Sequence, residues 1–478
     1  MLNNRKNNLS EPIKASFWFM VCGVLQRGIS VITTPIFTRL MSTSEYGVYS
    51  LFNSWQSILC VFVTLNLSAG VFTRGVVKNE DDIENFTSSF LGLSVLLTLV
   101  STVVYVLFSP FFNRLFNMNT VLMLCMLITM FNNTLFGFWS TRQRVDYKYK
   151  ALIAITLITS ILQPLLGIVG MYLFPLAKVE ARVISATFVG IVFYWGLALV
   201  QIKRSPKVYS SKYWKYALRF NIPLIPHYLS QSVLSSSDRI MIGKLCSESD
   251  AGIYSLAYSL AMLMTIVNTA ITNTFSPWLY KSIQHKQYKN IGSASYFLLI
   301  MVAIVNLILI AFAPEIIAIF APKEYADAVW AIPPVAMTVF FIFMYTMFAN
   351  FSFYYEKTKT IALTSCLGAV LNVILNAICI PVFGYVAAAY TTLICYICYS
   401  IGHYRLMRKI SKEYMDGAKI YDCKILIGLS VALILIGHSI MFIYSYPVIR
   451  YFCVLLIALV GVVGRKKIVW ICKKLKDS

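Results

Sequence analysis

DRIMIGKLCSESDAGIYSL, residues 238–256, begins with two adjacent charges inside a long apolar segment and passes through a short polar turn into the next one. An earlier version lies 205 positions upstream, where RLMSTSEYGVYSL at 39–51 aligns without a gap with KLCSESDAGIYSL at 244–256. Seven of these thirteen positions are identical, and Gln26 also falls on Gln231. A gapless match of this kind predicts two related halves, both embedded in a membrane.

The composition also indicates a membrane protein. Hydrophobic residues make up 59% of the 478 residues and charged residues 13%, and the mean hydropathy is +0.72, well outside soluble-domain usage. Apolar runs recur from end to end with a length of about twenty residues, enough to cross about 30 Å of hydrocarbon. They predict about fourteen transmembrane helices, the first at 15–38 and the last at 449–464.

The net charge of +22 is explained by membrane topology. When residues within two positions of a span end are counted with the adjoining loop, 32 of the 41 Lys and Arg residues lie in the termini and the even-numbered loops between these spans, and 7 lie in the odd-numbered loops. Arg27 and Arg239 lie within spans. Because positive residues collect on the cytoplasmic side, both termini should be cytoplasmic. The basic residues then contact lipid headgroups, and we expect no nucleic-acid partner.

The repeat and the spans together predict the organisation of the chain. We expect an N-terminal six-helix lobe at 1–202, a cytoplasmic linker at 203–220, a C-terminal six-helix lobe at 221–407, helices 13 and 14 at 408–464 and a basic cytoplasmic tail at 465–478. Because each lobe holds an even number of spans, the two should share their orientation and be related by a pseudo-two-fold axis along the membrane normal. The predicted fold class is an all-α polytopic membrane protein.

Polar side chains gather on one face of several spans. At 100° per residue, Gln26, Ser30 and Thr33 share a face of the first span, with Arg27 on its flank. An arginine at mid-bilayer costs about 2.5–3.5 kcal/mol on insertion scales, so Arg27 should face an anion in a cavity, pair with a neighbouring helix or extend its side chain toward the cytoplasm. Similar faces in the second, seventh and eighth spans complete the set of candidates: Arg27, Gln26, Ser30, Asn53, Gln56, His227, Gln231, Asp238, Arg239, Tyr258 and Asn268.

Signatures of catalysis are missing from the sequence. It contains no nucleotide-binding GxxxxGK[ST] motif, no cluster of metal ligands and no Ser-His-Asp set placed on one side of the membrane. We therefore expect a protein that is not an enzyme, without a metal or a cofactor.

Several short motifs carry a family resemblance. They are TPIFTR at 34–39 and EYGVYS at 45–50 in and after the first span, IPLIP at 222–226, DRIMIG at 238–243 and GIYS at 252–255 around the seventh, and FAPKEYA at 320–326 in an outer loop. As a set they resemble the bacterial polysaccharide transporter family. That family comprises lipid-linked oligosaccharide flippases within the multidrug/oligosaccharidyl-lipid/polysaccharide exporter superfamily.

The resemblance implies two six-helix lobes around a central cavity, lined by spans 1, 2, 7 and 8, that works by alternating access. It implies a substrate made of undecaprenyl-pyrophosphate-linked oligosaccharide, such as an O-antigen, capsule or exopolysaccharide repeat unit. This substrate would move from the cytoplasmic to the outer leaflet of the bacterial inner membrane. Arg27 and the other candidates then become headgroup contacts. Membrane lipids and a polysaccharide polymerase with its chain-length machinery are the other expected partners.

Two other functions stay open. A cation-coupled multidrug exporter would share the fold, although related exporters often carry an acidic residue within the first span, and this first span has none. A membrane polysaccharide polymerase or ligase would have a similar number of spans but usually needs a larger outer loop than this sequence offers. Coupling to a proton or sodium gradient stays open as well.

Overall fold

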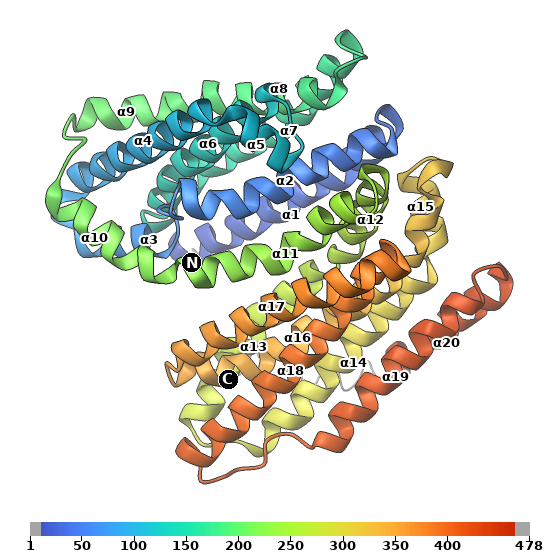
Figure 1. Ribbon diagram of the computed structural model, residues 1–478. Coiled ribbons are helices and arrows are strands. Elements are labelled where there is room, and N and C mark those ends of the chain that lie inside the picture. Colours follow the sequence, from blue (N-terminus) through green and yellow to red (C-terminus); the bar gives the residue numbers. More distant parts are fainter. Residues whose placement is uncertain (1–10, 464–478) are drawn as a thin grey trace, which may run out of the picture. The chain divides into compact units, whose positions relative to one another are not determined.

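The computed structural model describes residues 11–463, which form helices joined by short turns and fall into two compact units (Figure 1). The predicted basic tail at 465–478 lies outside the described residues. Unit 1 extends to Ser232 and unit 2 begins at Val233. Unit 1 contains α1 (Glu11–Leu40), α2 (Thr43–Val63), α3 (Gly70–Lys78), α4 (Ile83–Leu107), α5 (Ser109–Phe116), α6 (Thr120–Val145), α7 (Tyr149–Leu173), α8 (Lys178–Gly190), α9 (Gly196–Arg204) and α10 (Ser211–Asn221).

Helix α11 (Ile225–Leu245) contains the boundary, and unit 2 holds the rest of the chain. Its helices are α12 (Glu248–Met262), α13 (Thr265–Gln284), α14 (Lys289–Ala311), α15 (Ala313–Phe320), α16 (Ile332–Tyr354), α17 (Thr358–Phe383), α18 (Val386–Tyr414), α19 (Cys423–Phe442) and α20 (Pro447–Val463). Short 3-10 segments are η1 (Glu80–Asp82), η3 (Ile222–Leu224) and η4 (Lys323–Trp330), and a π-helical stretch, η2 (Ile191–Trp195), joins α8 to α9.

The predicted all-α polytopic membrane fold is confirmed. Within residues 11–463, eleven helical segments are long and apolar enough to cross a membrane. The three remaining predicted spans coincide with α2, α11 and α20, of which α2 and α11 are more polar and α20 is shorter. The count of fourteen transmembrane helices therefore stays a prediction.

The repeated stretch forms the same local structure in both units. α1 ends at Leu40 and α2 begins at Thr43, and 205 residues later α11 ends at Leu245 and α12 begins at Glu248. Ser42 accepts a hydrogen bond from the backbone N–H of Glu45 at 3.2 Å. The equivalent Ser247 accepts one from the N–H of Asp250 at 3.0 Å. Serine caps with an acidic residue three positions later start both helices, since each satisfies a free N–H group at the helix N-terminus.

An aromatic core holds unit 1 together. Phe72, Phe86, Phe90 and Phe138 of α3, α4 and α6 are fully buried, with ring centroids between 4.5 and 6.0 Å apart. Such aromatic pairs add about 0.5–1.5 kcal/mol each to the free energy gained by burial. This core fixes one end of the helices α4 and α6, and α6 in turn packs against α8.

The predicted linker packs on unit 1. Trp214 of α10 donates its Nε1–H to the backbone oxygen of Ser89 at 2.8 Å, and the Tyr213 hydroxyl donates to Asp82. Because α10 is docked on α3 and α4 in this way, the boundary between the units lies inside α11, between Ser232 and Val233. The sequence predicts instead a linker at 203–220 and a second lobe that begins at residue 221.

Unit 2 is built around α16, the most buried of its membrane-spanning helices. In its most apolar window of eighteen residues 83% are buried, and it packs against α12, α14, α18 and α19 (Figure 1). An ion pair attaches α20, because Arg450, only 2% exposed, donates to the Glu315 carboxylate at the start of α15. The Tyr451 hydroxyl donates to the same carboxylate at 2.8 Å.

Candidate functional site

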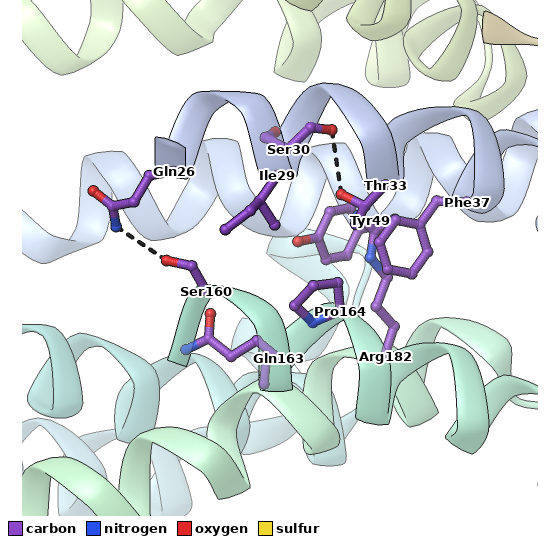
Figure 2. A pocket seen from close by; sticks show the side chains of 11 residues that line it. Gln26, Ile29, Ser30, Thr33, Phe37, Tyr49, Ser160, Gln163, Pro164 and Arg182 are labelled. Carbon is purple, nitrogen blue, oxygen red and sulfur yellow. Dashed lines mark hydrogen bonds between the residues drawn. The ribbon is translucent and has the colours of Figure 1, made fainter. Parts of the chain in front are cut away.

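A polar pocket of about 270 Å³ lies among α1, α2, α7 and α8 of unit 1 (Figure 2). Gln26, Ser30 and Thr33 reach it from one face of α1, as the helical periodicity predicts. The complete lining is Gln26, Ile29, Ser30, Thr33, Phe37, Tyr49, Ser160, Gln163, Pro164, Arg182 and Ala186. The pocket is therefore built entirely within one unit, and amide, hydroxyl and guanidinium groups dominate its polar surface.

A proline shapes the wall that α7 contributes. Pro164 lies inside this helix and has no N–H to donate to the carbonyl of Ser160, four residues earlier. The Ser160 hydroxyl accepts a hydrogen bond from the Gln26 amide at 3.1 Å, which joins α7 to α1. Ser160 thus lines the pocket and bonds to Gln26 at the turn where Pro164 removes one helical hydrogen bond.

Two glycines allow α8 to lie close to α7. A Cβ atom at Gly170 would lie 3.1 Å from the Ser185 Oγ and 3.4 Å from the Ala181 Cβ. At Gly167 the nearest atom would be the Cγ of Arg182 at 3.6 Å. Because both positions lack a side chain, α8 approaches α7 closely and places Arg182 at the pocket.

Arg182 is the charged centre of the pocket. Its guanidinium carbon lies 3.5 Å from the ring centroid of Phe37 and 3.6 Å from that of Tyr49, so the group is held between the two rings. Each such contact is worth about 0.5–2 kcal/mol. Its NH1 group donates a hydrogen bond to the sulfur of Met41 at 3.4 Å, a weak acceptor. Stacking covers the faces of the guanidinium and leaves its edge, where the N–H donors lie, for another partner.

The charge of Arg182 is not neutralised within residues 11–463, where no carboxylate forms an ion pair with it. The acidic side chains of the neighbouring segments have other partners. Glu45 lies 3.6 Å from the ammonium group of Lys178, and Glu180 accepts a hydrogen bond from Asn119 at 2.7 Å. A guanidinium that is positioned but lacks a carboxylate partner is suited to bind an anion.

Unit 2 contains a second polar centre, around Asp238. This carboxylate is 3% exposed and accepts hydrogen bonds from Tyr254 of α12, Asn376 of α17 and Thr392 of α18, each at 2.7 Å. It therefore ties α11 to three other helices. Among the described residues no basic side chain forms an ion pair with it, and the adjacent Arg239 instead stacks on Tyr258 at 4.3 Å. These hydrogen bonds replace the hydration that the carboxylate loses on burial.

The candidates predicted in the first half of the chain do not form one cluster. Gln26 and Ser30 line the pocket, whereas Arg27 is an exposed residue of α1 that does not line it. Asn53 is exposed and donates to the backbone oxygen of Tyr49 at 2.9 Å within α2. Gln56 lies half-buried on the same helix.

The candidates of the second half also have different surroundings. His227 is half-buried, with a ring nitrogen that has no hydrogen-bond partner in the described part of the chain, and Gln231 is exposed. Asn268 is buried and donates to the backbone oxygen of Val339 at 2.8 Å, a contact that joins α13 to α16. Asp238, Arg239 and Tyr258 are close together in unit 2, as described above.

Sequence reasoning misses Arg182, the residue with the clearest geometry. It stands at the second position of the expected sixth span, 181–202, so a count of charges assigns it to the preceding loop. Ser160 and Gln163 are missed because the span that carries them, 151–174, has no charged residue and few polar ones. A search that included every arginine within a few residues of a span boundary would have found Arg182.

Comparison with known families identifies the chain. The sequence profile described as "Polysaccharide biosynthesis protein" matches residues 13–283, more than half of its length. This chain belongs to the polysaccharide biosynthesis protein family. A second profile, that of the MatE family, matches residues 223–378. The resemblance predicted from the short motifs is confirmed.

Two relatives come from Haemophilus influenzae. "Lsg locus putative protein 1" is 23% identical over 202 residues, which is 41% of this chain and 50% of that protein. The match thus spans half the length of this relative. An uncharacterized membrane protein is 20% identical over 380 residues, 75% of this chain and 88% of the relative.

Solved structures of flippases and transporters share the fold of this family member. Lipid II flippase MurJ in an inward closed conformation has a TM-score of 0.68 at 14% identity and covers 94% of this chain and 99% of its own. An inward-facing MATE family transporter of the MOP superfamily has a TM-score of 0.63 at 14% identity, with 81% and 96% covered. At this identity the likeness concerns the fold, which is that of multi-pass membrane transporters.

Proposed function

We propose that this protein is a flippase that moves a lipid-linked oligosaccharide from the cytoplasmic to the outer leaflet of a bacterial inner membrane by alternating access. Membership of the polysaccharide biosynthesis protein family and the fold of flippases and transporters support a role in transport. We propose further that the glycan is carried on undecaprenyl pyrophosphate. It would serve as a repeat unit of O-antigen, capsule or exopolysaccharide.

The observation that carries the proposal is the guanidinium of Arg182. It lies in a polar pocket of a membrane-embedded unit, clamped by Phe37 and Tyr49 and without a carboxylate partner in the described part of the chain. Arg182 lies near the end of its span, and an ionisable side chain that faces a cavity of a membrane protein usually serves a pathway. A polar glycan and its pyrophosphate cannot cross hydrocarbon unaided, whereas a polyprenyl tail can stay in the lipid. A polar pocket with one fixed positive charge gives the glycan part of such a substrate a place outside the hydrocarbon.

The test is export in a strain that lacks the chromosomal copy. Arg182→Ala should abolish surface polysaccharide and cause the lipid-linked intermediate to accumulate, while Arg182→Lys should retain part of the export because lysine keeps the charge but not the bidentate fork. Arg114→Ala, which removes an exposed arginine of α5, is the matched control and should export normally. Protein abundance is checked by blot. Normal export by Arg182→Ala at wild-type abundance would contradict the proposal.

Arg27 stays a predicted headgroup contact. It is an exposed cation on the helix that contributes Gln26 and Ser30 to the pocket. Arg27→Ala should likewise block export, and Arg27→Lys should retain part of it, both measured in the same strain.

The energy source and the setting complete the proposal. Coupling to a proton or sodium gradient is part of the proposal, and Asp238, buried without an ion-pair partner among the described residues, is the acidic group that we assign to it. Both termini are proposed to be cytoplasmic, and a polymerase with its chain-length machinery to receive the glycan. Cysteines introduced one at a time into a cysteine-free variant and probed with an impermeant thiol reagent test the topology. Labelling from outside at Ser210 would contradict it.

A multidrug exporter of the same fold is the second candidate function. The match of the MatE profile to residues 223–378, the segment that holds Asp238, favours it. Drug susceptibility of the deletion strain separates the two functions. If the protein is a flippase, its deletion leaves susceptibility unchanged once cell-surface effects are controlled by an independent block of glycan synthesis. If it is an exporter, its deletion raises susceptibility with and without that block.

A further inference from the structure

The pocket of unit 1 has two chemically different ends (Figure 2). Gln26, Ser160 and Gln163 gather at one end, and Arg182 lies at the other between its two rings. Ile29 and Pro164 lie between the two ends (Figure 2). Amides and hydroxyls both donate to and accept from hydroxyl groups, and a guanidinium edge binds an anion. The apolar middle suits the C–H face of a sugar ring.

The charge of the pocket restricts the anion. Arg182 is the single charged side chain among the eleven residues of the lining. A carboxylate brings one negative charge and matches the guanidinium in bidentate geometry. A pyrophosphate carries more negative charge than one guanidinium neutralises, and the surplus would lie unpaired among helices of the membrane domain, which is unfavourable.

The size of the pocket restricts the rest of the ligand. Its volume of about 270 Å³ lies just below the range of about 300–1,000 Å³ that is typical of small-molecule sites. The pocket therefore suits a single sugar ring and is too small for a whole oligosaccharide.

We propose that this pocket is a subsite for one acidic sugar of the transported glycan, a sugar of the uronic acid type. Its carboxylate binds the Arg182 guanidinium, and its hydroxyl groups face Gln26, Ser160 and Gln163. This inference rests on the proposed function and deepens it, because it assigns a carboxylated sugar to the substrate. It also places the glycan, and not the pyrophosphate, in this pocket.

The experiment measures thermal unfolding of the purified full-length protein in detergent, with glucuronate, glucose or inorganic pyrophosphate added at matched ionic strength. A ligand that binds the folded protein raises its melting temperature in a saturable way. Glucuronate should do so with a half-saturating concentration about tenfold or more below that of glucose, because the carboxylate adds a charge-assisted contact. Pyrophosphate should give no shift beyond that of matched salt. A larger shift with pyrophosphate than with glucuronate, or equal half-saturation by glucose and glucuronate, overturns the inference.

Two variants and one control assign the effect to the pocket. Arg182→Gln should abolish the preference for glucuronate over glucose. Gln163→Ala should weaken the binding of both sugars and keep the preference. Arg114→Gln removes the same charge outside the pocket and should behave as wild type. A preference that survives Arg182→Gln overturns the inference. If Arg182→Gln does not fold, the three ligands on the wild-type protein decide.

A transport assay separates this inference from the proposed function. The protein is reconstituted in liposomes with fluorescent lipid-linked oligosaccharides that differ in one sugar, a glucuronate or a glucose. Faster flipping of the acidic substrate supports the inference. Equal flipping of both leaves the proposed function standing and overturns the acidic subsite. Flipping of neither substrate, while glucuronate still raises the melting temperature, contradicts the proposed function instead.

Discussion

Substitution of Tyr254 by phenylalanine should destabilise unit 2 by an amount that the structure sets. Tyr254 is fully buried, and its hydroxyl donates to the Asp238 carboxylate at 2.7 Å. A buried hydrogen bond to a charged group contributes about 1.5–3 kcal/mol. Asn376 and Thr392 still donate to the carboxylate after the substitution, each at 2.7 Å. The charge therefore keeps partners, and the loss should stay below the roughly 3–5 kcal/mol that follows when a buried charge loses its partner.

The repeat supplies a matched control for this substitution. Tyr49 occupies the equivalent position of unit 1, and its hydroxyl has no hydrogen-bond partner within residues 11–463. Its ring face rests on Arg182, and phenylalanine keeps that face. Tyr49→Phe should therefore change the free energy of unfolding by no more than about 0.5 kcal/mol, as for substitutions that remove no buried contact.

The assay is unfolding of both purified variants in mixed micelles, titrated with SDS and followed by tryptophan fluorescence. Equal losses for Tyr254→Phe and Tyr49→Phe would refute the reasoning, and so would a loss for Tyr254→Phe that is indistinguishable from zero. The first result would show that the hydroxyl group matters equally in both surroundings. The second would show that the hydrogen bond to Asp238 contributes nothing net.

Three further predictions concern packing inside each unit. Glu315→Gln should lower the free energy of unfolding by about 3–5 kcal/mol, because it leaves the buried Arg450 guanidinium without its carboxylate partner. Arg450→Met should cost less, because the Glu315 side chain is 30% exposed and keeps the hydrogen bond from Tyr451, and the double variant should lose less than the sum in a double-mutant cycle. Burial and the hydrogen bond to a carboxylate raise the pKa of Tyr213 to about 12. The Tyr213 hydroxyl therefore stabilises the folded state fully below about pH 10, the pKa of a tyrosine in the unfolded chain. The wild-type protein should melt at a higher temperature than Tyr213→Phe, and this difference should disappear as the pH rises toward 12. A difference that does not depend on pH would contradict this. Gly92→Ala should loosen the segment before α10, because the added Cβ would lie 1.9 Å from the backbone oxygen of Val208. Gly196→Ala is the control, since a Cβ there has open space around it. Limited proteolysis compares the two variants, and equal cleavage would contradict the predicted clash.

Features that depend on local sequence are predictable in this chain. The break between α1 and α2 and its repeat between α11 and α12 follow from serine caps and apolar periodicity, which act within a few residues. The shared face of Gln26 and Ser30 follows from helical geometry, and both residues do line the pocket. These are properties of a single helix or of a single turn.

Features that depend on which helices touch are not predictable from one sequence. Asp238 meets Asn376 and Thr392, which lie 138 and 154 residues further along the chain. Arg182 meets Phe37 only because α7 and α8 pack closely enough at Gly170 to bring α8 to α1. A charge count along the sequence gives every arginine near a span boundary the same weight. The packing decides which of them faces a pocket.

The two equivalent tyrosines show how the repeat has acquired opposite chemistry. In unit 1 the face of the Tyr49 ring holds the Arg182 cation at 3.6 Å. In unit 2 the hydroxyl of Tyr254 holds the Asp238 anion at 2.7 Å. An aromatic face carries partial negative charge and a phenolic hydroxyl is a donor, so one residue type stabilises either sign of charge according to the part it presents. In the proposed mechanism the cation of unit 1 binds the anionic substrate and the carboxylate of unit 2 takes up the driving cation. That division of labour needs no change at the tyrosine itself, only a different charged partner on a neighbouring helix.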